Sequence, residues 1–166
     1  MGKIKISFIL VTLLVFSKVY FGKNLDNISI TRLPKFSASP FFNEQVLTFN
    51  FFPEVRIQIN APSIGMFDPS KPTELIFYAL PNGNTIEQTV GRKLKTGDNW
   101  HFDIQNIGAQ TRFLRAHDHD NNIITVYLET SQLSWPAWRR KYTNNAELVK
   151  SIVDSVKNIF KDYNPF

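Results

Sequence analysis

The sequence predicts an α/β protein in which buried parallel strands alternate with helices. Two apolar runs, at residues 73–80 and 123–129, lack alternation, as strands covered on both faces do. A helical pattern lies between them, and another, over residues 145–161, follows the second. Residues 45–60 instead show the period of a two-stranded hairpin. We therefore expect a mostly parallel sheet with flanking helices and an antiparallel edge hairpin.

Residues 1–22 have the pattern of a signal peptide. Lys3 and Lys5 precede an apolar run of about 11 residues, which suits a signal-peptide core and is too short to span a bilayer. Ser17 and Gly22 are the candidate cleavage positions, and an uncleaved anchor is the alternative. The pattern predicts a secreted or periplasmic protein that has no membrane association once the peptide is removed.

Composition excludes several kinds of site. The chain has no cysteine, which rules out disulfides, thiolate metal sites and cysteine nucleophiles. Its formal charge of +5 would fall to +3 without residues 1–17, which is too little to predict nucleic-acid binding. The spacing of its glycines excludes G-x-S-x-G, the P-loop and G-x-G-x-x-G, and H-E-x-x-H is absent. No complete catalytic motif is present, and we expect no cofactor and no bound metal.

The predicted domain covers residues 45–166, after a linker or irregular lead-in at residues 23–44 that lacks any sustained period. Strands at 45–52 and 54–60 meet at Pro53, and the second alternates apolar with polar residues. Their short connection predicts a hairpin.

Helices are predicted from capping residues and apolar spacing. Asn84, with Glu87 three residues later, predicts a helix start, and Gly97 predicts its end. A second helix is expected over residues 101–116. A long loop then leads to the last helix, residues 145–161.

Two loops follow the predicted parallel strands, where ligands bind in open α/β sheets. In the first, the backbone amides of Asn82, Gly83 and Asn84 precede a helix and suit an oxyanion or phosphate. A simple strand-to-helix turn is the alternative. The second loop carries Trp135, Trp138 and Arg139, which suit a sugar or an acidic substrate. Tryptophans that cover the end of the core are the alternative there.

Two further clusters favour structural roles. His117, Asp118, His119 and Asp120 invite a metal site, but adjacent side chains in a turn rarely converge on one ion, and the EF-hand spacing is missing. The segment 98–103, with His101 and Asp103, is explained by helix capping and a tryptophan anchor.

Three segments carry a resemblance to a known family. "FYALPNGNT" (77–85), "WHFDIQNIGAQTRFLR" (100–115) and "SWPAWRRKY" (134–142) resemble parts of secreted bacterial hydrolase-like proteins. Over about residues 46–166, the order of elements resembles the first half of an α/β-hydrolase. The resemblance implies an oxyanion loop at residues 82–84, which departs from the H-G-G-G type, and places the serine, acid and histidine in polypeptide that would follow Phe166.

We therefore expect the N-terminal part of a secreted serine hydrolase acting on ester or related acyl bonds, truncated before the nucleophile elbow and inactive alone. Its substrate would be a small or glycan-linked molecule, and its partner the missing C-terminal part of its own domain. The strand at 123–129 would have an open edge and the helix at 145–161 a poorly covered face. The alternatives are a carbohydrate- or ligand-binding module without catalysis and a metal-dependent hydrolase.

Overall fold

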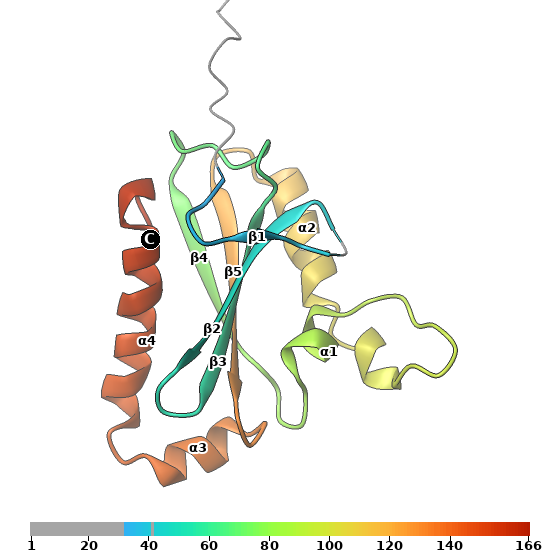
Figure 1. Cartoon of the computed structure of the whole chain (residues 1–166), viewed down its shortest axis with the longest axis vertical. Coiled ribbons are helices and arrows are strands. Elements are labelled where there is room, and N and C mark those ends of the chain that lie inside the picture. Colours follow the sequence, from blue (N-terminus) through green and yellow to red (C-terminus); the bar gives the residue numbers. More distant parts are fainter. Residues whose placement is uncertain (1–31, 41) are drawn as a thin grey trace, which may run out of the picture.

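A computed structural model describes residues 32–40 and 42–166, so the predicted signal peptide lies outside the described residues. The described chain forms one five-stranded sheet in the order β1-β2-β3-β5-β4 (Figure 1). The strands are β1 (Ser37–Ala38), β2 (Glu44–Phe51), β3 (Val55–Pro62), β4 (Thr73–Ala79) and β5 (Asn122–Thr130).

The prediction of a mostly parallel, α/β-hydrolase-like sheet is wrong. The pairings of β1 with β2, of β2 with β3 and of β3 with β5 are antiparallel, and β4 with β5 is the parallel pair. The strand at 123–129 is buried on both faces, as predicted, but burial reflects the layers above and below a strand and not the direction of its neighbours. The β2–β3 hairpin lies next to the end of the sheet, since the two-residue strand β1 pairs with β2 at Gln45 and Val46 alone and β3 is central.

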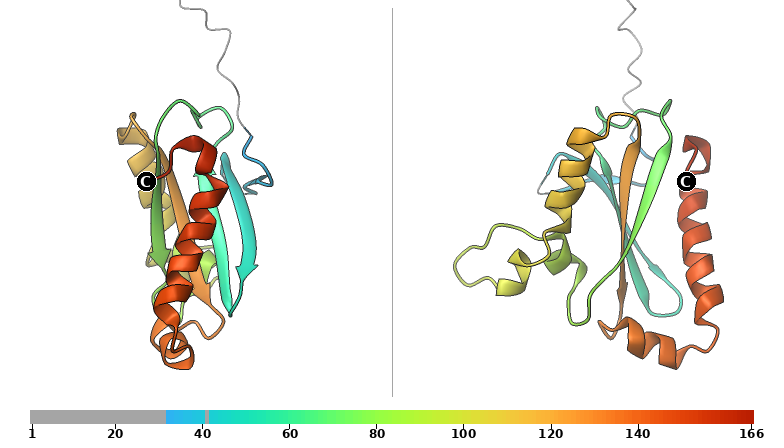
Figure 2. Two further views of the ribbon diagram at one scale, coloured as in Figure 1. Left: turned by 90° about the vertical axis from the view of Figure 1, so that its left-hand side faces the viewer. Right: turned by 180° about the vertical axis from the view of Figure 1, so that it is seen from behind.

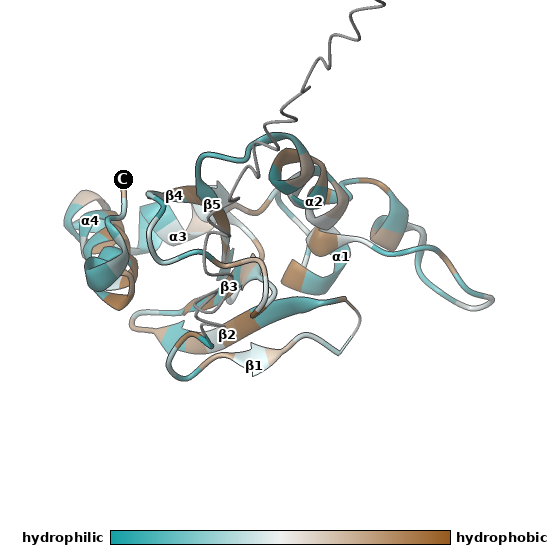
Figure 3. Ribbon diagram, turned by 90° about the horizontal axis from the view of Figure 1, so that it is seen from above, coloured by the Kyte–Doolittle hydropathy of each residue, from teal (hydrophilic) through white to brown (hydrophobic). Residues whose placement is uncertain are grey.

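Helices cover both faces of this sheet. They are α1 (Ile86–Val90), α2 (Ile107–His117), α3 (Trp135–Lys141) and α4 (Asn145–Ile159), with short 3-10 turns at Trp100–Asp103 and Lys161–Tyr163. Figures 2 and 3 show α1 and α2 on one side of the strands and α4 on the other. Helices between the parallel strands β4 and β5 provide the crossover that a parallel pair requires.

The first helix is shorter than predicted. Thr85, not Asn84, is the N-cap, and it forms a reciprocal capping box with Gln88. The helix ends at Gly91 and not at Gly97, because the backbone of Gly91 leaves the helical conformation with a φ of 79°. Glycine is required there, since a Cβ would also lie 2.8 Å from the Cα of Asn106.

The remaining helices also differ from the predicted boundaries. The expected helix at 101–116 is a 3-10 turn followed by α2, and the two are separated where Asn106 adopts a left-handed conformation with φ of 51°. The loop expected before the last helix contains α3, whose start is capped by Ser134 and fixed by Pro136 in the first turn. The last helix is confirmed as α4.

The main core lies between the sheet and α3–α4. It includes Trp138, Ile152, Val156 and Phe160, all at most 1% exposed. The apolar face of α4 is therefore covered, and β5 lies inside the sheet, so both predictions of exposed surface there are wrong. Leu33 and Phe36 of the expected lead-in also belong to this core. No helix in residues 32–40 and 42–166 is long and apolar enough to cross a membrane.

Candidate functional site

The loops after β4 and β5 meet at one edge of the sheet. Because these two strands are parallel, their carboxyl ends lie together. The loops are joined directly, since the Gly83 N–H donates to the carbonyl of Leu133 at 2.8 Å. Both residues have positive φ, 84° for Gly83 and 51° for Leu133. Both segments follow the parallel strands, as the sequence predicted, but residues 135–141 of the second form α3 and not a loop.

The three backbone amides of the first loop do different things. The Gly83 N–H is bound to Leu133, and the Asn84 N–H donates to the Pro81 carbonyl at 3.3 Å. The Asn82 N–H has no hydrogen-bond partner among the described residues, and Asn82 is exposed. The side chain of Asn84 is buried, and its Nδ2 lacks a partner in the same part of the chain. The loop therefore offers a free, exposed backbone donor at Asn82, and it also holds a buried side-chain donor at Asn84.

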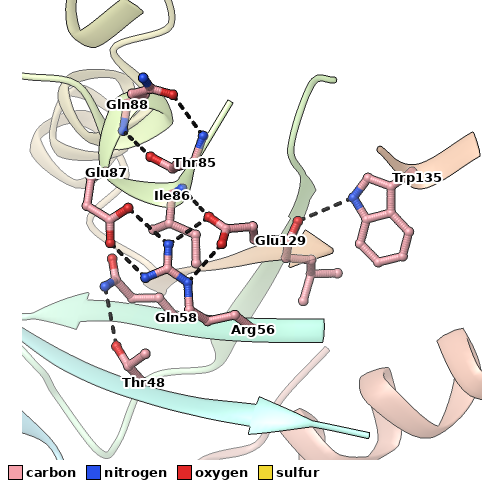
Figure 4. A network of polar contacts seen from close by, with 10 residues as sticks. Thr48, Arg56, Gln58, Thr85, Ile86, Glu87, Gln88, Glu129 and Trp135 are labelled. Carbon is pink, nitrogen blue, oxygen red and sulfur yellow. Dashed lines mark hydrogen bonds and ion pairs between the residues drawn. The ribbon is translucent and has the colours of Figure 1, made fainter. Parts of the chain in front are cut away.

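An ion-pair network holds the helix that follows this loop (Figure 4). Arg56 of β3 binds both oxygens of Glu129 on β5, at 3.1 and 2.7 Å, and both oxygens of Glu87 on α1, at 2.8 and 2.9 Å. Glu129 also accepts the N–H of Ile86 at 2.7 Å. The network ties two strands to the first turn of α1 and so fixes where the loop ends.

The network favours the charged forms of Arg56 and Glu87. Hydrogen bonds to Arg56 lower the pKa of Glu87, and the same bonds to Glu87 and Glu129 raise the pKa of Arg56. Two carboxylates face one guanidinium, so the group carries a net negative charge at neutral pH. These groups are saturated by one another, and we assign them to positioning the loop. Sequence reasoning missed the network, because Arg56 and Glu129 are 73 residues apart.

The tryptophans of the second loop are largely part of the protein interior. Trp138 is 1% exposed, and its indole N–H donates to the Pro53 carbonyl at 3.0 Å. Trp135, labelled in Figure 4, is half-buried. It packs edge-on against Trp138, and its indole N–H donates to the Leu128 carbonyl at 3.3 Å. Their indole N–H groups are thus used within the chain. Arg139 is exposed and lines a shallow cavity of about 290 Å³ with Pro136, Arg140 and Asn145.

The histidine and aspartate cluster forms a turn. Asp118 accepts hydrogen bonds from the backbone of Asp120 and from the backbone and side chain of Asn121, and these bonds lower its pKa. His117 contacts the Phe113 carbonyl. In the segments that the structure describes, no group of three or more metal-binding side chains is placed to hold an ion. The segment 98–103 is also held by local contacts. The Asn99 side chain accepts a hydrogen bond from the His101 backbone N–H and contacts the His101 ring.

A second polar cluster, which we call the Glu44 cluster, lies on the α2 side of the sheet and was not predicted. Its members are Glu44, Asn60, Arg112, Arg115 and Tyr127. Glu44 binds Arg115 at 3.0 Å and the side-chain amide of Asn60 at 2.9 Å, and Arg112 lies 3.5 Å away. Two guanidinium groups face one carboxylate. Because Glu44 and Arg115 are 71 positions apart in the sequence, no local pattern could have shown the cluster.

Beside this cluster is a cavity of about 240 Å³. Its walls are mostly apolar and include Phe42, Pro62 and Met66, with Arg112 and Arg115 among the lining residues. Arg112 stacks over the Phe42 ring at 3.7 Å. Burial lowers the pKa of Arg115, so its charge is held at a desolvation cost that Glu44 offsets.

Comparison with known proteins adds no assignment: no family model, no curated protein and no solved structure matches this chain.

Proposed function

We propose that this chain forms the oxyanion-binding side of an acyl-bond hydrolase site. The observation that carries the proposal is the junction of the two loops at the carboxyl edge of β4 and β5, through Gly83 and Leu133. It leaves the Asn82 N–H free in a loop whose other amides are bound. A fixed donor of this kind stabilises negative charge without reorganising during the reaction.

The surrounding contacts support this role. The 2.8 Å bond from Gly83 and the Arg56 network hold both ends of the loop in place. Asn84 carries a buried donor that has no acceptor in the described part of the chain. Buried donors in folded proteins are nearly always paired, with ordered water where the protein supplies no acceptor, so Asn84 keeps the inner side of the loop polar.

The proposed chemistry is acyl transfer to a serine. The serine Oγ would attack the acyl carbonyl while a histidine takes its proton, and the carbonyl oxygen would become an oxyanion bound by the Asn82 N–H. Collapse of the tetrahedral intermediate returns the proton to the leaving group. The serine, histidine and acid are supplied, in this proposal, by polypeptide outside the described residues. The chain by itself is therefore expected to be inactive.

Titration with methylphosphonate, a tetrahedral anion, tests the oxyanion role. In the ¹⁵N-labelled chain we expect saturable shifts of the Asn82 and Gly83 amide signals. Asn82→Pro removes the N–H together with its signal and should abolish the shift of Gly83, whereas Asn82→Ala keeps the N–H and should keep both shifts. Shifts that are absent, or that persist in Asn82→Pro, would overturn the proposal.

A ligand-binding module without catalysis is the second candidate, and the cavity beside the Glu44 cluster favours it. Apolar walls with an excess of guanidinium charge suit an anion that carries an apolar group. Benzoate is a suitable probe. We expect it to shift the signals of Phe42 and Met66, and to do so less in Arg112→Met; equal shifts in both proteins would count against this candidate.

A further inference from the structure

Two neighbouring cavities lie at the amino ends of β4 and β5. The first has a volume of about 100 Å³, and the second is the cavity of about 240 Å³ beside the Glu44 cluster. Pro62, Met66 and Arg115 line both cavities, and Lys71 and His119 line the first alone. Figure 1 shows this end of the sheet opposite the loops that follow β4 and β5, so the cavities are separate from the oxyanion loop.

Arg115 is a fixed positive charge between the two cavities. Its side chain is 7% exposed. Its Nε donates to the Ile123 carbonyl and its Nη2 to the Asn60 carbonyl, both at 2.9 Å, and its Nη1 donates to Glu44 at 3.0 Å. A guanidinium has five N–H groups, so two of them stay unused within residues 32–40 and 42–166. A buried donor held in this way needs no rearrangement to bind an anion.

The backbone that carries Lys71 is also fixed. The Asn122 side chain donates to the carbonyls of Asp68 at 2.8 Å and Lys71 at 3.3 Å, and it accepts the Asp68 N–H at 2.9 Å. Two residues after Lys71, Thr73 begins β4 and makes a parallel bridge to Pro165 on the outer side of the strand. The lysine therefore extends from a segment that is held on both sides.

The charged groups around the two cavities leave a positive excess. Three cations, Arg112, Arg115 and Lys71, line the cavities together with two carboxylates, Glu44 and Asp118. Both carboxylates are already bound by neighbouring side chains. The Lys71 ammonium makes no hydrogen bond or ion pair in the part of the chain that the structure describes. The excess of one positive charge favours a ligand with a single negative charge.

The second cavity suits an alkyl chain, because its walls are mostly apolar and include Phe42 and Met66. Met66 lines both cavities and is 62% exposed. Methionine is unbranched and flexible, so its side chain adapts to a bound molecule. Met66 is therefore the residue whose rotation would connect the two cavities.

We propose that the two cavities form one binding site for an alkyl carboxylate such as hexanoate. The carboxylate lies in the first cavity, bound by Arg115 and Lys71, and the alkyl chain passes Met66 into the second. The inference rests on the ligand-binding candidate of the proposed function and narrows its ligand class. A short anion such as benzoate fits the second cavity alone, whereas an extended alkyl carboxylate reaches both.

Nuclear magnetic resonance titration with hexanoate tests the site. The chain has two methionines, Met1 and Met66, so labelled methionine methyl groups report on Met66 with little overlap. We expect hexanoate to shift the Met66 methyl signal and the Lys71 and His119 amide signals with one shared dissociation constant. Acetate carries the carboxylate alone and hexan-1-ol the chain alone, and each should bind at least about tenfold more weakly.

Two lysine variants provide a matched pair. Lys71→Gln removes the proposed charge contact and should weaken hexanoate binding about fivefold, with binding of hexan-1-ol unchanged. Lys157→Gln removes an exposed charge from α4, on the other face of the sheet, and should leave hexanoate binding unchanged. The Lys71 side chain makes no hydrogen bond among the described residues, so its replacement is not expected to unfold the chain.

Hexanoate shifts at Met66 without shifts at Lys71 and His119, or different dissociation constants for the two groups of signals, would overturn the joined site. Equal affinities of Lys71→Gln and Lys157→Gln would overturn the role of Lys71. These failures differ from failure of the proposed function. Benzoate shifts at Phe42 would still support the ligand-binding candidate, and methylphosphonate shifts at Asn82 and Gly83 report on the opposite end of the sheet.

Discussion

The two faces of the sheet are built differently. The face under α3 and α4 is an apolar layer in which Trp138, Ile152 and Phe160 are almost fully buried. The face under α1 and α2 has a small apolar cluster and a large polar one, with buried atoms of Asn60 and Tyr127 that lack partners among the described residues. The α3–α4 face is therefore expected to supply most of the stability, because its side chains are closely packed. The α1–α2 face is organised by specific polar contacts and holds the groups that could bind a ligand.

Removing an aromatic ring from the apolar face should lower the free energy of unfolding more than any other change considered. Phe160 is completely buried, so Phe160→Ala is expected to lower the free energy of unfolding by about 3–5 kcal/mol through lost burial and a cavity. Phe113 on α2 is 63% exposed, and Phe113→Ala should cost less than about 0.5 kcal/mol. Urea denaturation measures both, and similar costs would contradict the division between faces.

The second-largest loss of stability is expected at Gly91, where the end of α1 packs against the start of α2. Gly91→Ala places a Cβ against Asn106 at a φ of 79°, and we expect a loss of about 1–3 kcal/mol. Gly65 has nothing within 4 Å of its built Cβ, so Gly65→Ala should be neutral or slightly stabilising. Thermal unfolding of the two variants separates strain from the general effect of replacing glycine; a neutral Gly91→Ala would show that α1 and α2 are loosely joined.

The two carboxylates of the ion-pair network should contribute unequally to the free energy of unfolding. The Glu129 side chain is 13% exposed and that of Glu87 is 53% exposed. Glu129→Gln is therefore expected to cost about 1–2 kcal/mol, and Glu87→Gln less than about 1 kcal/mol, because exposed pairs contribute little. A double-mutant cycle with Arg56→Met measures each coupling. A larger coupling for Glu87 would reverse our ranking of the two contacts.

The Tyr127 hydroxyl should have the smallest effect at neutral pH. This hydroxyl lies close enough to Thr111 to influence the pKa of Tyr127 but makes no well-aligned hydrogen bond among the described residues, so Tyr127→Phe should change the unfolding free energy by less than about 1 kcal/mol. A pronounced loss would show that the hydroxyl has a partner.

High pH provides a second readout for this residue. Burial raises the pKa of Tyr127 to about 12 from 10.0, so the folded state holds the proton more tightly than the unfolded state. Stability should be unaffected below pH 10 and fall as the pH rises from there toward 12, with a slope that Tyr127→Phe lacks. Denaturation curves of both proteins over this range measure the difference.

Sequence patterns predicted the strands better than their arrangement. The runs at 73–80 and 123–129 match β4 and β5 closely, because each strand is a continuous apolar run. Of the two, β5 is buried on both faces as predicted, whereas β4 lies at the end of the sheet and is only partly buried, so the prediction that it is covered on both faces is wrong. The antiparallel pairing of β3 with β5 leaves no such signature, since it joins residues about seventy positions apart. Helix α3 was missed because Trp135 and Pro136 resemble loop residues unless the Ser134 cap is recognised.

The candidate site was predicted only in part, because some of its contacts are local in sequence and others are not. Turn chemistry at residues 81–85 is local, so the loop could be located from sequence. The bond from Gly83 to Leu133, which decides that Asn82 is the free donor, depends on tertiary structure. The partners of Glu44 are likewise distant in sequence, and a buried glutamate has no pattern of its own.

The parallel bridge at Thr73 also bears on how copies of this chain meet. Two copies joined through β4 by a twofold axis would have to pair these strands antiparallel. Residues 164–166 already bond to Thr73 and Leu75, so antiparallel pairing along the whole of β4 would require these three residues to be displaced. They therefore oppose symmetric edge-to-edge dimerisation at the start of β4.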